Sequence, residues 1–477
     1  MSRMAMPDPA SAFRQRSRSA VDDSAQRQNF RSAMDYLQAK RRTQFPDEQE
    51  LVGLRDLGEA IRRYSLANLP RLLEQLEQNL TANGIRVHWA ESADAANAIA
   101  LGIAHRVEAR RIVKGKSMVS EEIGFNHAMQ AAGIEALESD MGEYIVQLAG
   151  ETPSHIIMPA IHKTRQAIAA LFVEKIPGVE YTEDVDALIQ IGRRVLRRKF
   201  AEADIGLSGV NFAVAETGTL CLVENEGNGR MCTTVPRVHI AVTGIEKVVE
   251  KLEHVPPLFS LLTRSATGQA VTTYLNLISH PRQPGEKDGP EEVHLILIDN
   301  GRSQAYADAQ LRTTLQCIRC GACMNHCPVY ARIGGHAYGT TYPGPIGAIV
   351  SPHMLGLAAT YPLAFASTLC HACVEVCPVR IPITDLLIRL RNEAQAQPGT
   401  VNASLRGSGA ARTALVSAIW SAWALIYSRL GLYRLTSWFM SRGRALSPIE
   451  QGAWTRSRTP LTPAPRRLRD LLKDRRP

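Results

Sequence analysis

Residues 317–328 read CIRCGACMNHCP, in which two, two and three residues separate four cysteines and a proline follows the last one. The chain has 477 residues and nine cysteines, seven of them between Cys317 and Cys377. Structural zinc sites pair two well-separated cysteine or histidine couples, whereas here four thiols lie within eleven residues. Such clustering in a long chain without an export signal argues for a metal centre rather than for disulfides.

This spacing is that of the bacterial ferredoxins, in which three cysteines bind one [4Fe–4S] cluster and the fourth binds its neighbour. Gly321 lets the backbone approach the cluster closely. A second motif, CHACVEVCP at residues 370–378, repeats the last three cysteines and the proline. The sequence therefore predicts two [4Fe–4S] clusters and a function in single-electron transfer.

The ferredoxin rule also assigns the ligands. Cluster 1 would take Cys317, Cys320, Cys323 and the distant Cys377, and cluster 2 would take Cys327, Cys370 and Cys373. Ser367 stands where the second motif would have its first cysteine, so one corner of cluster 2 is left open. The hydroxyl of Ser367, a water molecule or a ligand from a partner could fill that corner. With no fourth ligand, the cluster would have three irons.

The remaining cysteines and two histidines are expected to be structural. Cys221 and Cys232 are isolated in the sequence and are predicted to be buried thiols. His336 and His353 lie between the two motifs, where a loop histidine is more often structural or exposed than an iron ligand. Helices expected around both motifs favour an all-helical ferredoxin module at residues 306–395. In this respect it resembles the iron–sulfur subunits of succinate dehydrogenase and fumarate reductase.

Residues 66–305 alternate short apolar runs with amphipathic segments. The runs at 156–158 (IIM), 220–223 (LCLV) and 295–298 (LILI) are nearly continuous, as in strands buried on both faces. Residues 85–89 alternate between apolar and polar side chains, as a strand does. The pattern predicts an α/β domain with a largely parallel sheet.

Two further regions flank these domains. Residues 1–65 are predicted to form a helical arm that packs on another part of the protein. Residues 396–477 are predicted to form a linker and a helical carboxy-terminal extension. The uncharged run 413–428 has 16 residues, fewer than the roughly 20 that span a bilayer. A helix docked on a neighbouring domain or subunit is favoured, and an interfacial helix at the inner face of a membrane is the alternative.

Charge and other motifs exclude several classes of function. The net charge of +9 lies largely at the two ends of the chain, and no nucleic-acid-binding motif accompanies it. The amino terminus lacks the apolar core of a secretory signal, so we expect a cytoplasmic protein. Residues 115–117 (GKS) resemble the end of a phosphate-binding loop, but Arg110 replaces the required glycine. No dinucleotide-binding fingerprint is present.

Residues 216–219 (ETGT), 228–230 (NGR) and 236–240 (PRVHI) resemble the signature of the LUD domain. With the cysteine motifs and the tail, the whole chain resembles the lactate utilization protein B family, iron–sulfur proteins of bacterial L-lactate oxidation. The resemblance implies a LUD domain with a fold similar to CoA transferases and ribose-5-phosphate isomerase. It also implies two partners, a cysteine-rich-motif subunit and a second LUD protein, that act with this chain in converting L-lactate to pyruvate.

The sequence thus favours an electron-transferring subunit of a lactate-oxidising complex, with no catalytic residue assigned. One alternative makes the LUD domain the substrate site, in which Arg230 would clamp a carboxylate and His239 would take the hydroxyl proton near Glu216. The residues alone favour a plainer interpretation of this loop, a tight turn held by salt bridges. A third hypothesis makes the chain an iron–sulfur scaffold or redox sensor, although no output domain is visible.

Overall fold

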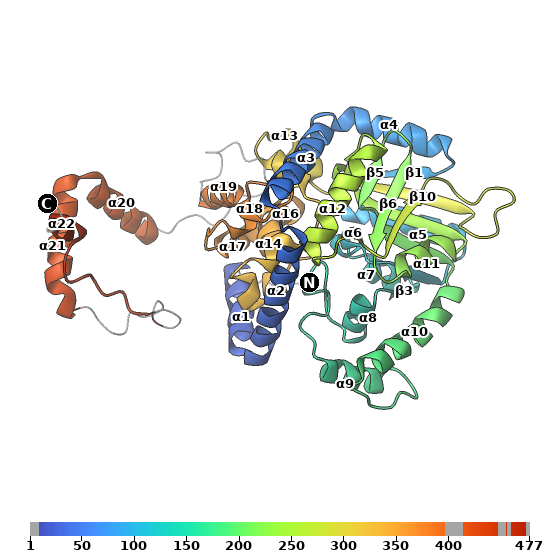
Figure 1. The fold of residues 1–477 in the computed structure, drawn as a ribbon, viewed down its shortest axis with the longest axis horizontal. Coiled ribbons are helices and arrows are strands. Elements are labelled where there is room, and N and C mark those ends of the chain that lie inside the picture. The colour runs from blue at the N-terminus through green and yellow to red at the C-terminus, as the bar shows by residue number, and fades with distance from the viewer. Residues whose placement is uncertain (1–8, 396–413, 447–454, 456–458, 474–477) are drawn as a thin grey trace, which may run out of the picture. The chain divides into compact units, whose positions relative to one another are not determined.

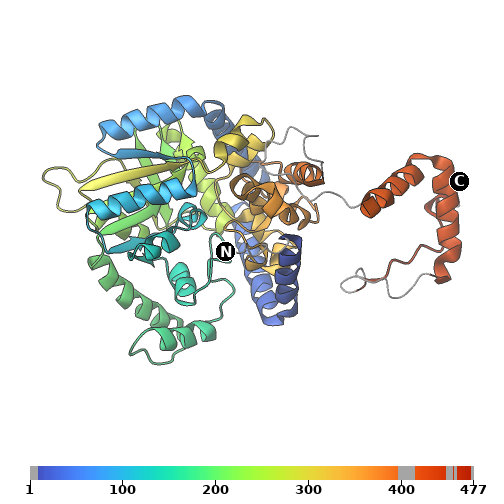
Figure 2. The same cartoon turned by 180° about the vertical axis from the view of Figure 1, so that it is seen from behind.

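The structure, a computed structural model, describes residues 9–395, 414–446, 455 and 459–473. The chain divides into two compact units, Met1–Gly409 and Ala410–Pro477. Figures 1 and 2 show the first unit from opposite sides, with a sheet domain next to a group of short helices. The amino-terminal helices lie beside that helical group in both views.

The helices of the first unit precede, cover and follow its strands. The α-helices are α1 (Pro9–Asp22), α2 (Ser24–Gln44), α3 (Glu48–Ala67), α4 (Leu69–Ala82), α5 (Ala93–Arg106), α6 (Met118–Glu122), α7 (Phe125–Ala131), α8 (Met141–Leu148), α9 (Arg165–Lys175), α10 (Val185–Ala201), α11 (Asn228–Thr234), α12 (Val255–Ala266), α13 (Arg302–Ala307), α14 (Ala322–Asn325), α15 (Tyr330–Ile333), α16 (Gly344–Leu355), α17 (Leu357–Phe365), α18 (Ala372–Glu375) and α19 (Ile383–Gln395). The 3-10 helices are η1 (Ile245–Lys247), η2 (Leu252–His254), η3 (Leu311–Gln316) and η4 (His336–Tyr338).

A six-stranded sheet forms the centre of the α/β domain, and all its pairings are parallel. Its strands, in spatial order, are β1 (Arg86–Ala90), β10 (Glu292–Ile298), β7 (Val238–Gly244), β4 (Ile205–Gly209), β2 (Arg111–Lys114) and β3 (Glu135–Glu138). All seven residues of β7 are buried, because helices cover both faces of the sheet. The predicted α/β domain with a parallel sheet is confirmed.

Alternate residues of one strand enter two different cores. Ile296 and Ile298 of β10 pack with α5 and α7, whereas Leu295 and Leu297 pack with α4 on the other face. A strand that is buried on both faces has apolar residues at every position. This is why the continuous apolar run 295–298 predicts a strand.

A smaller sheet has the order β8-β5-β6-β9, with β8 (Val248–Val249), β5 (Phe212–Val214), β6 (Thr219–Glu224) and β9 (Tyr274–Ile278). The run 220–223 lies in β6, as predicted. The strand expected at 156–158 is wrong, since these residues form an irregular loop. Ile156 is buried there in the core that contains the clustered cysteines, so this run is apolar because it packs on the cysteine module and not because it joins a sheet.

The amino-terminal helices are part of the core of the cysteine module. Helix α2 contacts α14 and α15, and α1 contacts α15, α17 and η4. Phe30 and Met34 of α2 are buried with Tyr330 and Tyr338 of the module. Arg16 of α1 donates to the Ala337 carbonyl at 3.1 Å. The predicted arm therefore packs on helices that lie about 300 residues later in the sequence.

In the second unit, the described elements are α20 (Ala414–Ser428), α21 (Leu430–Arg442), η5 (Gly443–Leu446) and α22 (Leu468–Lys473). Trp420, Trp423 and Tyr427 form a row of ring contacts on α20, and all three are exposed. Across the described part of the chain, no helix combines the length and the apolar character needed to cross a membrane.

Candidate metal centre

Four of the predicted ligands surround one small cavity. Cys317, Cys320, Cys323 and Cys377 line it together with apolar side chains, among them Ile156. Helices α14 and α18, which follow the two cysteine loops, pack against each other and bring Cys377 to the first motif. This is the grouping that the ferredoxin spacing predicts for cluster 1, while ligation by these residues stays a prediction.

The donors of this group suit a metal centre. Burial, followed by the neighbouring cysteines, raises the pKa of Cys320 and Cys323, and burial raises that of Cys377 to about 11. Such thiols become thiolates when a metal ion supplies compensating positive charge. The Ile381 N–H donates to Cys377 Sγ at 3.3 Å, a contact of the kind that tunes an iron–sulfur centre. The residues fit an iron–sulfur cluster.

The remaining cysteines of the motifs form a second group. Burial first, and then the nearby Cys327 and Cys370, raise the pKa of Cys373 to about 12, so the three lie within electrostatic reach of one another. Cys327 and Cys373 are buried, whereas Cys370 is exposed. The second group therefore reaches the protein surface.

Ser367 occupies the position in the second loop that Cys317 occupies in the first. The Arg319 N–H donates to Cys317 Sγ at 3.3 Å, and the Leu369 N–H donates to Ser367 Oγ at 3.2 Å. Arg319 and Leu369 share a left-handed backbone, with φ of 62° and 55°. Gly321 and His371, two residues further on, share it too, with φ of 75° and 66°. The two loops have the same conformation, and the serine hydroxyl stands in place of the thiol.

Cationic side chains gather around the first group. Arg62 of α3 is fully buried and donates to the carbonyls of the two residues before Cys317, at 3.0 and 3.2 Å. Arg319 Nη2 lies 3.5 Å from a carboxylate oxygen of Glu246, and its guanidinium lies 4.5 Å from the centre of the Tyr342 ring. Positive charge beside a cluster is one of the factors that set its reduction potential.

A cavity of about 240 Å³ lies between the α/β domain and this group. Lys116, Glu226 and Arg319 are among its lining residues. Glu226 is exposed as a whole, but desolvation of its carboxyl group, followed by the nearby charge of Asp140, raises its pKa. Nη1 of Arg319 is buried and has no hydrogen-bond partner within the described ranges. A lysine, an arginine and a glutamate side chain thus line the cavity.

The structure does not bring Glu216, Arg230 and His239 together as the substrate hypothesis required. Burial lowers the pKa of His239 to about 3, and its Nε2 lies 2.8 Å from Ser208 Oγ inside the sheet. Arg230 stacks on Tyr274, at 4.2 Å from the ring centre. Glu216 accepts a hydrogen bond from the Leu252 N–H at 3.2 Å. These contacts are structural. Glu224 accepts the N–H groups of Gly229 and Arg230 at 2.6 and 2.7 Å, so backbone hydrogen bonds hold the turn, and the described residues show no salt bridge of Glu216 or Arg230.

The two isolated cysteines are buried, as predicted. Burial raises the pKa of Cys221 and Cys232 to about 12, which keeps both thiols protonated and unreactive. His353 is also buried, and burial lowers its pKa to about 4, consistent with a structural histidine.

Sequence reasoning missed the loop at residues 151–164, between α8 and α9, which joins the α/β domain to the cysteine module. His155 accepts the Ile157 N–H at Nδ1 (3.0 Å), and its Nε2 lies 2.9 Å from Asn325 Oδ1 beside Cys323. The Tyr330 hydroxyl donates to the Ser154 carbonyl at 2.7 Å. In the sequence, the apolar run 156–158 predicted a strand here, and His155 and His162, which lie seven residues apart, do not by themselves predict this loop.

A parallel-sheet α/β domain joined to a module with two cysteine groups defines a class, the LUD-domain proteins that carry an iron–sulfur module. The LUD domain family matches residues 73–298, and the 4Fe-4S dicluster domain family matches residues 313–381. The family described as lactate utilisation protein B, C-terminal, matches residues 389–476. The chain belongs to the lactate utilization protein B family.

Full-length relatives support this membership. Lactate utilization protein B of Bacillus pumilus is 41% identical over 479 residues, with 99% of each chain covered. The Bacillus licheniformis protein of the same name is 40% identical, covering 99% of this chain and 98% of its own. An uncharacterized electron transport protein of Escherichia coli, YkgF, is 42% identical over 92% of this chain and 91% of its own. A DUF162 family crystal structure from Deinococcus radiodurans aligns with a TM-score of 0.28 at 17% identity, too low to bear on the fold.

Proposed function

We propose that this chain is the electron-carrying iron–sulfur subunit of a system that oxidises L-lactate to pyruvate. The observation that carries the proposal is the crossing of the two motifs, in which Cys377 of the second motif lines one cavity with the first three cysteines of the first motif. Iron–sulfur clusters bound there would supply one-electron transfer, and lactate oxidation releases two electrons. Relatives named for lactate utilization support lactate as the substrate of the system.

The protein's own residues set the conditions for electron transfer. Apolar side chains enclose the first group, and Arg62 and Arg319 place positive charge beside it. Cys370 is exposed, which gives a partner access to the second group. The first group therefore suits an internal position in a relay and the second suits an entry or exit point.

We extend the proposal to the folds of the two domains and to the partners of the chain. Every element described from Arg302 to Gln395 is a helix, which supports an all-helical ferredoxin module. The parallel sheet is compatible with a fold similar to CoA transferases and ribose-5-phosphate isomerase. A cysteine-rich-motif subunit and a second LUD protein would act with this chain in the cytoplasm. The exposed aromatic side chains of α20 would contact one of these partners or the inner face of the membrane.

Electron paramagnetic resonance on anaerobically purified protein tests the relay. Signals of reduced clusters should appear when L-lactate is added together with both partners, and should be absent when lactate or the partners are omitted. Clusters that reduce with dithionite but never with lactate would overturn the proposal. Reversible reduction without loss of iron would also exclude a labile redox sensor.

A second candidate function is binding of a 2-hydroxy acid in the 240 Å³ cavity, because the cationic side chains of Lys116 and Arg319 both line it. A planar guanidinium suits a carboxylate, and Glu226, which also lines the cavity, could accept a hydrogen bond from the hydroxyl group. Arg319→Gln should then weaken L-lactate binding at least about tenfold in calorimetry, while Arg230→Gln, which changes the exposed arginine stacked on Tyr274, should not. Lactate that does not bind the wild-type protein would end this candidate and leave the relay standing.

A further inference from the structure

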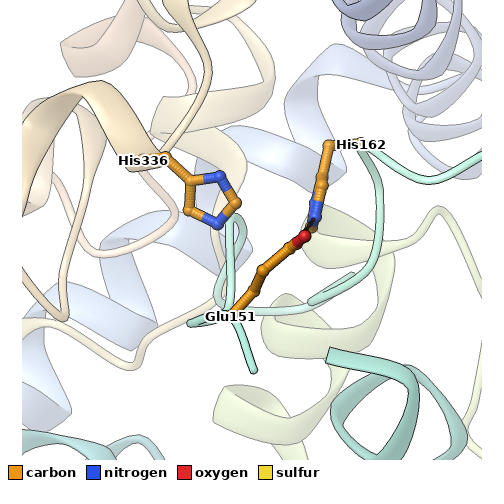
Figure 3. A group of neighbouring side chains, drawn as sticks. All are labelled: Glu151, His162 and His336. Carbon is orange, nitrogen blue, oxygen red and sulfur yellow. Dashed lines mark hydrogen bonds and ion pairs between the residues drawn. The ribbon is translucent and has the colours of Figure 1, made fainter. Parts of the chain in front are cut away.

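Two histidines and a glutamate meet where the α/β domain touches the cysteine module (Figure 3). Glu151 and His162 come from the loop 151–164, and His336 is the first residue of η4. One possible ligand atom from each of the three residues lies within 4.8 Å of the other two. The rings of His162 and His336 lie 4.7 Å apart, at 73° to each other.

The surrounding backbone holds these side chains in place. His336 donates from Nε2 to the Thr152 carbonyl at 2.7 Å, which fixes the ring and leaves Nδ1 as the nitrogen that can ligate. A histidine ligand of a metal ion commonly donates its other nitrogen in this way. The Gly335 N–H donates to Ser154 Oγ at 3.3 Å, and a Cβ on Gly335 would lie 1.8 Å from the Ser154 carbonyl oxygen. Only glycine permits so close an approach of the two domains.

His162 and Glu151 have the unused capacity that a metal site requires. The side chain of His162 is 9% exposed, and its buried Nδ1 has no hydrogen-bond partner in the described part of the chain. Its Nε2 lies 2.6 Å from one carboxylate oxygen of Glu151, and Lys163 pairs with the other oxygen. A metal ion could therefore take the place of the contact between His162 Nε2 and the Glu151 carboxylate. Lys163 would continue to hold the other carboxylate oxygen from outside the site.

We propose that Glu151, His162 and His336 bind a divalent transition-metal ion at this junction. Two imidazoles and one carboxylate form a donor set that zinc and ferrous ions prefer, and metal–ligand distances of about 2.0–2.2 Å put neighbouring donors about 3.4 Å apart. Small rotations of side chains now within 4.8 Å reach that spacing. Three protein ligands leave a position open, and all three residues line a cavity of about 1010 Å³. That position would accept water or a small oxygen-donor ligand.

The site goes beyond electron transfer and does not rest on it, since it uses no cysteine. Zinc chloride alone, titrated by calorimetry into the EDTA-treated protein with its clusters retained, should bind at one ion per chain. Glu151→Gln, His162→Gln and His336→Gln should each weaken zinc binding at least about tenfold, the size that even outer-shell losses reach. His105→Gln, at an exposed helix end, is the matched control and should bind zinc as the wild type does.

Two outcomes would overturn the proposal. One is a wild-type protein without saturable zinc binding, and the other is unchanged affinity in both Glu151→Gln and His336→Gln with normal iron content. X-ray absorption at the zinc edge of the wild-type protein provides a test that needs no variant. Nitrogen and oxygen neighbours at about 2.0–2.1 Å would support the site, whereas sulfur at about 2.3 Å would assign the zinc to cysteines and refute it.

Discussion

Replacing Phe30 with alanine should loosen the amino-terminal arm from the cysteine module. Phe30 of α2 is 1% exposed, and its ring packs edge-to-face on Tyr330 with centroids 5.8 Å apart. A Cβ on Gly334 would lie 2.6 Å from the same ring, so the ring packs directly against this glycine. Glycine has no side chain that could fill the cavity left by alanine at position 30. Burying a phenylalanine removes about 150–250 Å² from water, worth about 4–6 kcal/mol at about 25 cal/mol per Å². Alanine retains a small part of this, so the free energy of unfolding should fall by about 3–5 kcal/mol.

Anaerobic urea unfolding, followed by the visible absorbance of the clusters, measures this change. Tyr36→Ala is the matched control, because Tyr36 lies on the same helix and is 57% exposed. Its effect should stay within about 0.5 kcal/mol. If Phe30→Ala changed stability by less than about 1 kcal/mol, or no more than Tyr36→Ala did, the arm would not be part of the core of the module.

Three further predictions concern the cysteine loops and the domain junction. Ser367→Cys should place a fourth thiolate on the second cluster and convert any three-iron resonance signal to a four-iron one; a free thiol that alkylates readily at this position would show that the side chain does not reach iron. Burial lowers the pKa of His155 to about 4, below the ordinary value of about 6.5, so the unfolded chain binds the extra proton and stability is lost as pH falls below about 6.5. His155 should contribute about 1.4 kcal/mol to the loss at pH 5.5, measured as the difference between the wild type and His155→Gln in urea unfolding. An equal slope in the two proteins would contradict this assignment. Gly335→Ala should cost about 2 kcal/mol or more, because its Cβ would lie 1.8 Å from the Ser154 carbonyl oxygen. Gly53→Ala, in open space on a helix, should be neutral or stabilising, and similar melting of the two variants would argue against the close contact.

The sheet could be predicted where burial follows from local sequence. Residues 220–223 and 295–298 are apolar because they lie inside sheets, and continuous runs predicted them correctly. Residues 156–158 gave the same signal for a different reason, since Ile156 packs on the distant cysteine module. A short apolar run reports burial and does not tell what covers it.

The cysteine groups could be predicted because the ligand pattern is encoded in spacing. The equivalence of Ser367 and Cys317 was visible as a spacing, and the backbone shows it as a shared turn. The group of Glu151, His162 and His336 could not be predicted, because more than 170 residues separate His336 from each of the other two. Nη1 of Arg319, which is buried without a hydrogen-bond partner among the described residues, likewise depends on packing between two domains.

The packing of α2 on the cysteine module has a consequence for biosynthesis. Phe30 meets Tyr330 about 300 residues later in the chain, so at about 5–20 residues per second the helix waits roughly 15–60 s for its partner to emerge from the ribosome. The first cysteine group waits still longer, until Cys377 has been translated. During that interval the nascent chain exposes an apolar helix face and incomplete sets of thiols. Any shielding of the apolar face must therefore act during translation, whereas iron can fill the first site only after the module is complete. A truncated product that ends before Cys377 would have no complete first site to fill.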